Sequence, residues 1–153
     1  LFKHNTKNNL YLFSINLFSI SYYPFLITII LTQFFFDPSI FFSFLEDLHK
    51  SGIDVPVVPG IILISDFPRI HKFAEKCGAH IPDRISNCFT DIEAGSESAN
   101  SIAEELALQQ CKTLIENGVH MLHFFTLNRL DLAARTCKSL LNEFCSLEAS
   151  DYR

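Results

Sequence analysis

From residue 29 onward, short apolar runs alternate with segments of helical spacing, and this alternation restricts the folds open to the chain. Residues 29–36 form a branched and aromatic run typical of a strand buried on both faces. Similar runs cover residues 53–58, which Pro59-Gly60 is expected to end, and residues 119–127. Strands separated by helices in this way indicate βαβ units, a parallel sheet and right-handed crossovers.

Capping residues mark where the helices between these strands should begin and end. Asp37-Pro38 predicts an N-cap followed by the first helical residue, and Gly52 is a suitable stop. Ser65-Asp66 and Gly78 bound a second helix in the same manner. We further expect a short helix or turn over 82–89, a polar loop over 90–100, and helices with apolar faces over 102–115 and 132–144.

The number of these units is too small for a closed fold. An eight-stranded βα barrel needs about 250 residues, or roughly 30 per unit. Only three units follow residue 28, and three parallel strands leave both sheet edges unpaired. We therefore predict an α/β fold that is an incomplete (βα)8 TIM barrel, with a hydrophobic leader over 1–28, the barrel part over 29–147 and a frayed tail over 148–153.

The leader differs in composition from the rest of the chain. No Asp or Glu precedes Asp37, and residues 9–36 carry no charge at all. A membrane span flanked by Lys3 and Lys7 is one interpretation. The other is AT-rich sequence translated without selection, which we favour because Asn16, Pro24 and Gln33 interrupt the apolar run. We thus expect a leader that is not native, and no membrane partner.

Charge and cysteine content exclude several classes of function. The net charge of −5 provides no basic surface for nucleic acid. The five cysteines are odd in number and lack CxxC spacing, so we expect neither a disulfide framework nor a metal site, and a reducing, cytoplasmic location. The cysteines lie mostly at apolar helix positions and are expected in the core. We expect four acidic residues on a solvated face, namely Glu93, Glu97, Glu104 and Glu105.

Three motifs stand in order within the barrel part. They are residues 32–37 (TQFFFD), 52–61 (GIDVPVVPGI) and 123–129 (HFFTLNR), with Phe73-Ala74-Glu75 and Ile81-Pro82 between them. Together they resemble the methylenetetrahydrofolate reductase family over about residues 29–146, which correspond to the last three strands of a flavin-dependent TIM barrel. The resemblance implies FAD-dependent, NAD(P)H-driven reduction of 5,10-methylenetetrahydrofolate to 5-methyltetrahydrofolate in one-carbon and methionine metabolism. It also implies homo-oligomers, and it leaves NADH against NADPH open.

Three residues are the main candidates for binding, and each has a simpler structural interpretation. Gln33 ends an apolar strand, where its amide can pair with a ligand edge or with a neighbouring strand. Phe73 lies on an apolar helix face, and Arg129 can be a surface residue at a helix start. The resemblance implies that Gln33 and Phe73 bind folate and the nicotinamide nucleotide in turn, and that Arg129 pairs with the folate glutamate tail. We expect all three at one end of the sheet.

Further residues follow from the same resemblance. Arg69 stands where some relatives have Gln beside folate, and Phe125 stands where many have Tyr and keeps an aromatic face for the nucleotide. His123 is expected to be structural, since no orienting carboxylate is near it in sequence. The family's catalytic glutamate and most FAD contacts lie on earlier strands, so the chain alone is expected to lack catalysis and flavin binding. The alternative is a nonfunctional truncated or membrane-associated product.

Overall fold

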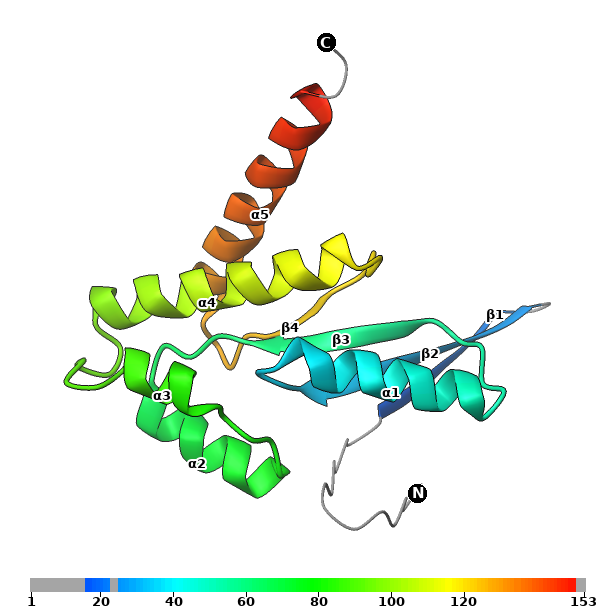
Figure 1. Ribbon diagram of the computed structural model, residues 1–153, viewed down its shortest axis with the longest axis horizontal. Coiled ribbons are helices and arrows are strands. Elements are labelled where there is room, and N and C mark those ends of the chain that lie inside the picture. Colours follow the sequence, from blue (N-terminus) through cyan, green and yellow to red (C-terminus); the bar gives the residue numbers. More distant parts are fainter. Residues whose placement is uncertain (1–15, 23–24, 151–153) are drawn as a thin grey trace.

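The computed structural model describes the backbone of residues 16–22 and 25–150 and the side chains of residues 29–144. Four strands form one sheet, in the order β1 (Asn16–Tyr22), β2 (Phe25–Phe34), β3 (Val57–Ile62) and β4 (His123–Phe125). The helices are α1 (Pro38–Lys50), α2 (Phe67–Cys77), α3 (Asp83–Cys88), α4 (Glu97–Glu116) and α5 (Leu130–Ser150). Figure 1 shows α2 and α3 beyond one end of the sheet, α4 lying along the sheet, and α5 leading away from it.

The sheet confirms the predicted parallel arrangement of the three strands. β2 pairs parallel with β3, and β3 pairs parallel with β4. β1, which lies within the expected leader, adds a fourth strand that is antiparallel to β2. β2 itself begins at Phe25 and so crosses the predicted boundary at residue 28. None of the helices in the described part of the chain is long and apolar enough to cross a membrane.

Two strand boundaries differ from the prediction. β3 covers Val57–Ile62 rather than 53–58, and it continues through Pro59 and Gly60. Both residues are buried, and Gly60 pairs with Phe34 on one side and His123 on the other, so they belong to the strand rather than ending it. β4 is only His123–Phe125, because its ladder with β3 is limited to Gly60–Ile62.

Helix capping agrees closely with the sequence pattern. Asp37 accepts a hydrogen bond from the Ser39 amide at 3.0 Å, and Asp66 accepts one from the Arg69 amide at 3.1 Å. Gly78 ends α2 in the left-handed conformation. α4 begins at Glu97, earlier than predicted, because Ser96 caps the Ala99 amide at 3.1 Å. α5 reaches Ser150 and so extends into the segment predicted to be a frayed tail.

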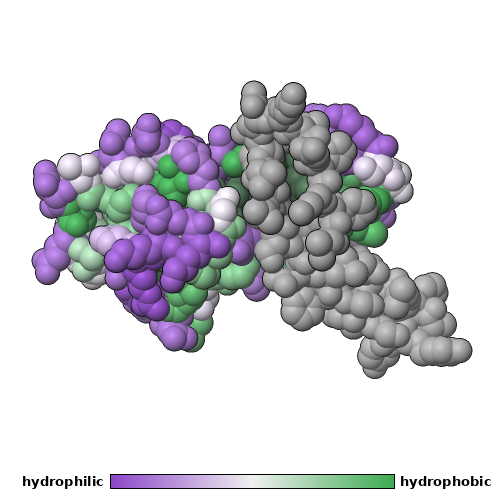
Figure 2. All heavy atoms as spheres, turned by 90° about the horizontal axis from the view of Figure 1, so that it is seen from below, coloured by the Kyte–Doolittle hydropathy of each residue, from purple (hydrophilic) through white to green (hydrophobic). Residues whose placement is uncertain are grey.

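Side chains alternate between two hydrophobic cores along β3 and the two residues that follow it. Ile61 and Leu63 pack in the core formed with α1, α4 and α5. Ile62 and Ile64 pack in the core formed with α2 and α3. The sheet therefore contributes side chains to two cores, and the second core is shared with α2 and α3, which lie beyond one end of the sheet (Figure 1). Figure 2 shows the outer surface in one view, where hydrophilic residues dominate and apolar residues are interspersed between them.

The cysteines do not all lie in the core. Cys111 is fully buried, with 0% of its surface exposed, and burial first, then the neighbouring Cys137, raises the pKa of its thiol to about 12. Cys77 and Cys137 are half-buried, whereas Cys88 is exposed on the short helix α3, contrary to the prediction. The side chain of Cys145 lies outside the described residues.

This contrast predicts selective thiol labelling. With an aromatic disulfide reagent at pH 8, Cys88 should react in the folded protein and Cys111 only on unfolding, because the thiolate is the nucleophile. Raising the pH to 9 stays below the pKa of about 12 for Cys111, so its labelling should remain slow. Peptide mass spectrometry identifies each site, with Cys88→Ser and Cys111→Ala as controls. Rapid labelling of Cys111 in the folded protein would contradict the buried placement.

Candidate binding site

A β-bulge interrupts β2 at the position of Gln33. Leu31 lies opposite Val58 and Phe34 lies opposite Gly60. The segment of β2 between these pairs is therefore one residue longer than the facing segment of β3, which defines a bulge. The buried Thr32 hydroxyl, 1% exposed, accepts a hydrogen bond from the Gly60 amide at 3.0 Å and donates to the Gln33 carbonyl at 2.9 Å. The bulge therefore has its own fixed hydrogen bonds, and it presents Gln33 as a half-buried residue at the end of the strand.

Gly60 lies opposite the bulge in the ladder between β2 and β3. Its position has no room for a side chain. A Cβ atom there would lie 2.6 Å from Cε2 of Phe125, 2.7 Å from the Thr32 carbonyl oxygen and 3.0 Å from the Gln33 carbonyl carbon. Glycine therefore allows the Phe125 ring of β4 to approach the bulge closely. The His123 ring packs edge-on against Phe125, with centroids 4.8 Å apart, and its expected structural role stays a prediction.

Phe34, the residue after the bulge, joins the aromatic residues of three elements. Its ring stacks on Phe73 of α2, with centroids 5.3 Å apart and an interplanar angle of 29°. It meets Phe125 of β4 edge-on at 5.9 Å. We call Phe34, Phe73 and Phe125 the aromatic cluster. The structure thus brings Phe73, Phe125 and the backbone of Gln33 together at the carboxyl end of the parallel strands.

Arg129 follows β4 at the same end of the sheet but has different partners. Its Nε donates to Oδ1 of Asp131 at 3.3 Å, and its Nη2 donates to Oδ1 of Asn100 at 3.1 Å and to Oδ2 of Asp131 at 3.4 Å. The hydrogen bond from Arg129 is the main reason that the pKa of Asp131 is lowered. None of the interactions within the described part of the chain joins Arg129 to Gln33 or Phe73, so their predicted convergence stays a prediction.

A strained turn places Arg129. The Arg129 amide donates to the Thr126 carbonyl at 2.8 Å, and Leu127 and Asn128 between them have φ values of 45° and 69°. Two successive positive φ values define a type I′ turn, which costs about 1–2 kcal/mol at a residue such as leucine. Strain of this kind often occurs at functional sites.

Arg69 lies on α2, one helical turn before Phe73. It is exposed, and its backbone amide is held by the Asp66 cap at 3.1 Å. Residues four apart are neighbours on a helix surface, so Arg69 and Phe73 share one face of α2. This places a cation next to the aromatic cluster.

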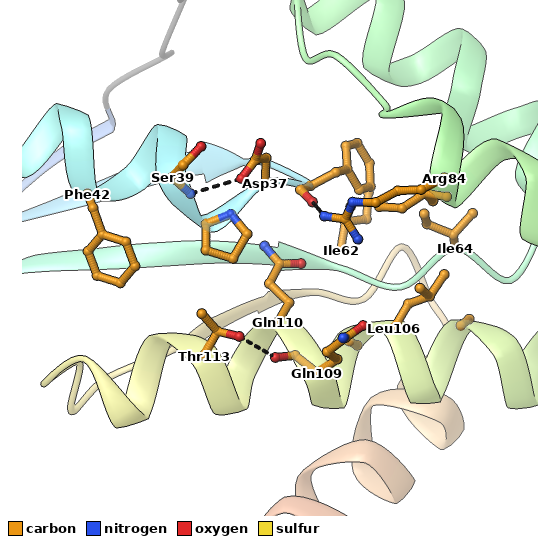
Figure 3. A pocket seen from close by; sticks show the side chains of 15 residues that line it. Asp37, Ser39, Phe42, Ile62, Ile64, Arg84, Leu106, Gln109, Gln110 and Thr113 are labelled. Atoms are coloured by element: carbon orange, nitrogen blue, oxygen red, sulfur yellow. Dashed lines mark hydrogen bonds between the residues drawn. The ribbon is translucent and has the colours of Figure 1, made fainter.

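A cavity of about 420 Å³ lies elsewhere, between the start of α1, α3 and α4. Figure 3 shows Gln110 extending from α4 toward the start of α1, and Arg84 entering from α3. The Gln110 side chain donates to the Phe35 carbonyl at 2.8 Å, and Arg84 donates to the Phe36 carbonyl at 3.4 Å. The residues proposed for binding do not line this cavity, and its polar groups connect elements of the fold. No three His, Cys, Asp or Glu side chains gather as metal ligands within the described residues.

Comparisons with known proteins identify a matching family and several relatives. The family model described as methylenetetrahydrofolate reductase matches residues 28–141. The 5,10-methylenetetrahydrofolate reductases of Pectobacterium carotovorum subsp. carotovorum and of Escherichia coli (strain K12) are 34% and 33% identical to this chain over 110 residues. Each alignment covers 72% of this chain but 37% of the relative.

A plant relative shows the same partial coverage. The protein named methylenetetrahydrofolate reductase (NADH) 1 of Arabidopsis thaliana is 33% identical over 100 residues, which are 65% of this chain and 17% of that protein. The chain therefore spans little more than a third of the bacterial relatives and less of the plant one.

The bulge predicts that Thr32→Val destabilises the protein more than the same change elsewhere. Valine keeps the β-branched shape but leaves the buried Gly60 amide without an acceptor, at a cost of about 1–3 kcal/mol. Thr136→Val is the matched control, because the equally buried Thr136 hydroxyl donates to the Leu132 carbonyl at 3.0 Å, which also accepts the helical amide bond. Urea unfolding measures both variants. An equal or smaller loss for Thr32→Val would contradict this role of the bulge.

The strained turn predicts that glycine is tolerated better than valine at Leu127, the reverse of their order within a helix. Glycine should leave the free energy of unfolding within about 1 kcal/mol of the parent, since it adopts positive φ freely, whereas valine should lose at least about 1 kcal/mol. At Leu141, an exposed position within α5, the order should reverse, with glycine costing about 1 kcal/mol and valine less. The same urea titrations test all four variants, and an identical order at both positions would argue against strain at Leu127.

Proposed function

Because the chain belongs to the methylenetetrahydrofolate reductase family, we propose that it forms the carboxyl-terminal part of the ligand-binding surface of such an enzyme. The proposed reaction is FAD-dependent reduction of 5,10-methylenetetrahydrofolate to 5-methyltetrahydrofolate by NAD(P)H, in the cytoplasm. The family match over residues 28–141 supports this proposal. Since the chain spans 37% of its bacterial relatives, the complete activity requires further residues, and the chain alone is proposed to be inactive.

We also propose that β2, β3 and β4, with the helices that follow them, are the last three units of a (βα)8 barrel. Two parallel ladders in sequence order support this, as does the core that α1, α4 and α5 form with the sheet. β1 occupies the edge of β2 in antiparallel orientation, whereas a barrel has only parallel strands. This supports the proposal that β1 is not part of the barrel, and it moves the proposed start of the barrel part from residue 29 to the start of β2 at Phe25.

The binding of a planar ligand is proposed for Gln33 and the aromatic cluster. The observation that carries this proposal is the bulge, which places Gln33 beside Phe34 and Phe125 at the carboxyl end of the strands. The Gln33 amide offers both a donor and an acceptor to the edge of a pterin or a nicotinamide. The half-buried Phe73 ring stacks on Phe34 with one face, and its other face is proposed to receive the ligand ring.

Arginine residues are proposed to bind the negatively charged parts of these ligands. Arg129 has a side chain that is 34% exposed, and Arg69 stands one turn from Phe73. Both are suited to carboxylates, because a guanidinium offers a fork of donors. Arg129 is assigned to the glutamate tail of folate, and Arg69 to a nearby anionic group.

The described residues do not by themselves form a binding site for FAD. Its pyrophosphate would need positive helix ends, but α1 and α2 begin at the carboxylates of Asp37 and Asp66, which accept the free amides there. α4 begins at Glu97, directly after its Ser96 cap. We therefore derive no step through the flavin, and we assign its binding and the catalytic acid to residues of the relatives that this chain does not match.

Titration calorimetry with 5-methyltetrahydrofolate tests the proposed binding. Gln33→Ala and Phe73→Ala should each weaken the affinity by about two- to tenfold, since a hydrogen bond or a stacking contact contributes about 0.5–1.5 kcal/mol. Phe67→Ala is the matched control, because Phe67 lies on the same helix but stacks on Phe89, with centroids 5.2 Å apart. It should change stability and leave the affinity unaltered.

Two outcomes of this experiment would count against the proposal. Equal affinities of all variants and the parent would remove Gln33 and Phe73 from the site. An absence of any binding would favour a nonfunctional product instead. Stoichiometric FAD in the purified chain, seen by its absorbance, would contradict the assignment of flavin binding to other residues.

A further inference from the structure

Asn100 is a buried polar residue that neither the sequence pattern nor the family resemblance singled out. It lies near the start of α4 and is 7% exposed. Its amide makes two hydrogen bonds: Oδ1 accepts from Nη2 of Arg129 at 3.1 Å, and Nδ2 donates to Oε2 of Glu97 at 3.4 Å. Burying an amide is unfavourable unless such bonds are made, so these contacts fix its orientation.

Glu97 is held on the far side of Asn100 by a second arginine. Nη1 of Arg135 donates to Oε1 of Glu97 at 2.8 Å, and this hydrogen bond is the main cause of the lowered pKa of Glu97. The carboxylate therefore stays charged near neutral pH and stays paired with Arg135. Asn100 stands between this ion pair and Arg129, so that the chain of contacts runs from Arg135 through Glu97 and Asn100 to Arg129.

The contacts of Arg129 leave one part of its guanidinium available. Nε and Nη2 donate to Asp131 and Asn100, whereas Nη1 has no partner among the described residues. The Asn100 oxygen accepts from Arg129 without adding a negative charge. Asp131 is then the one carboxylate paired with Arg129 in the described part of the chain, and two N–H groups remain for an external anion.

Both ends of Arg129 are thus held before a ligand arrives. The type I′ turn over Leu127 and Asn128 fixes its backbone, and Asp131 and Asn100 together fix the plane of its side chain. Orienting a flexible arginine in advance lowers the entropy lost on binding. A ligand carboxylate can accept from the two N–H groups of Nη1 in a guanidinium that is held in this way.

We propose that Asn100 is a positioning residue, which orients Arg129 toward a ligand carboxylate and keeps Glu97 from neutralising it. This inference rests on the proposed function, in that Arg129 is assigned to the anionic tail of folate. It predicts that Asn100 contributes to recognition of the tail and has no effect on recognition of the pterin ring.

The test compares two ligands that differ only in the tail. Folate carries a glutamate and pteroate lacks it, so the ratio of their affinities, measured by calorimetry on the whole chain, reports tail recognition. Arg129→Ala should abolish the preference for folate. Asn100→Ala should lower it by roughly three- to tenfold, with pteroate affinity unchanged.

Asn100→Asp separates positioning from a purely structural role. Aspartate has the same shape and still accepts from Arg129, but it cannot donate to Glu97 and adds a charge beside it, so stability should fall under either role. A structural role predicts that the folate preference is retained in the folded variant. Positioning predicts that the preference falls further than with alanine, because a second carboxylate neutralises Arg129. Glu104→Gln is the matched control, because Glu104 lies on α4 like Asn100 but pairs with Arg135 of α5, at 3.8 Å. This substitution should leave the folate preference intact.

The outcomes distinguish this inference from the proposed function. If Arg129→Ala removes the preference while both Asn100 variants retain it, Asn100 has no positioning role and the proposed function stands. If Arg129→Ala has no effect on the preference, the role of Arg129 fails and the inference fails with it. If neither ligand binds, both are overturned. Urea unfolding of each variant identifies any loss that comes from misfolding.

Discussion

The hydrogen bond between the Thr32 hydroxyl and the Gly60 amide is the contact on which the arrangement of the carboxyl end of the sheet depends. It closes the bulge in β2 and so fixes the register of β2 against β3. Beyond the bulge, Phe34 and Phe36 join the core with α2 and α3, while Phe35 joins the core with α1, α4 and α5. Without an extra residue at this point, these side chains would exchange faces. Because the bulge places Phe34 on the side of α2 and α3, its ring contacts Phe73 and Phe125 and forms the aromatic cluster.

Local rules predicted the parts of the fold that local interactions determine. The caps at Asp37, Asp66 and Gly78, and the parallel order of three strands, agree with the sequence pattern. The Pro59-Gly60 pair was misjudged as a strand end, because its place in the ladder depends on a partner 28 residues earlier. The pairing of β1 was missed for a similar reason, since its run of residues carries no periodic pattern that separates a strand from a leader.

The candidate site was predictable only in part. The motifs drew attention to Gln33, Phe73, Phe125 and Arg129, and the structure joins the first three through Phe34 and Gly60. These two connecting residues lie in the motifs over 32–37 and 52–61, but Gly60 was expected to end its strand, and the sequence did not indicate what either residue contacts. Asn100 and Glu97 belonged to segments expected to be a polar loop and a solvated acidic face. Their roles depend on Arg129 and Arg135, which are distant in sequence, so spacing alone could not reveal them.

The antiparallel pairing of β1 makes the two edges of the parallel strands differ in how readily they can accept a further strand. β2 has both of its edges engaged, by β1 and by β3, whereas β4 pairs on one side only within the described strands. A further parallel strand can add directly to β4, but at β2 it must first displace β1 by strand exchange. Closure of this sheet into a cylinder would therefore be a stepwise process with a competing intramolecular hairpin, and the kinetics of that exchange would decide how readily the chain assembles.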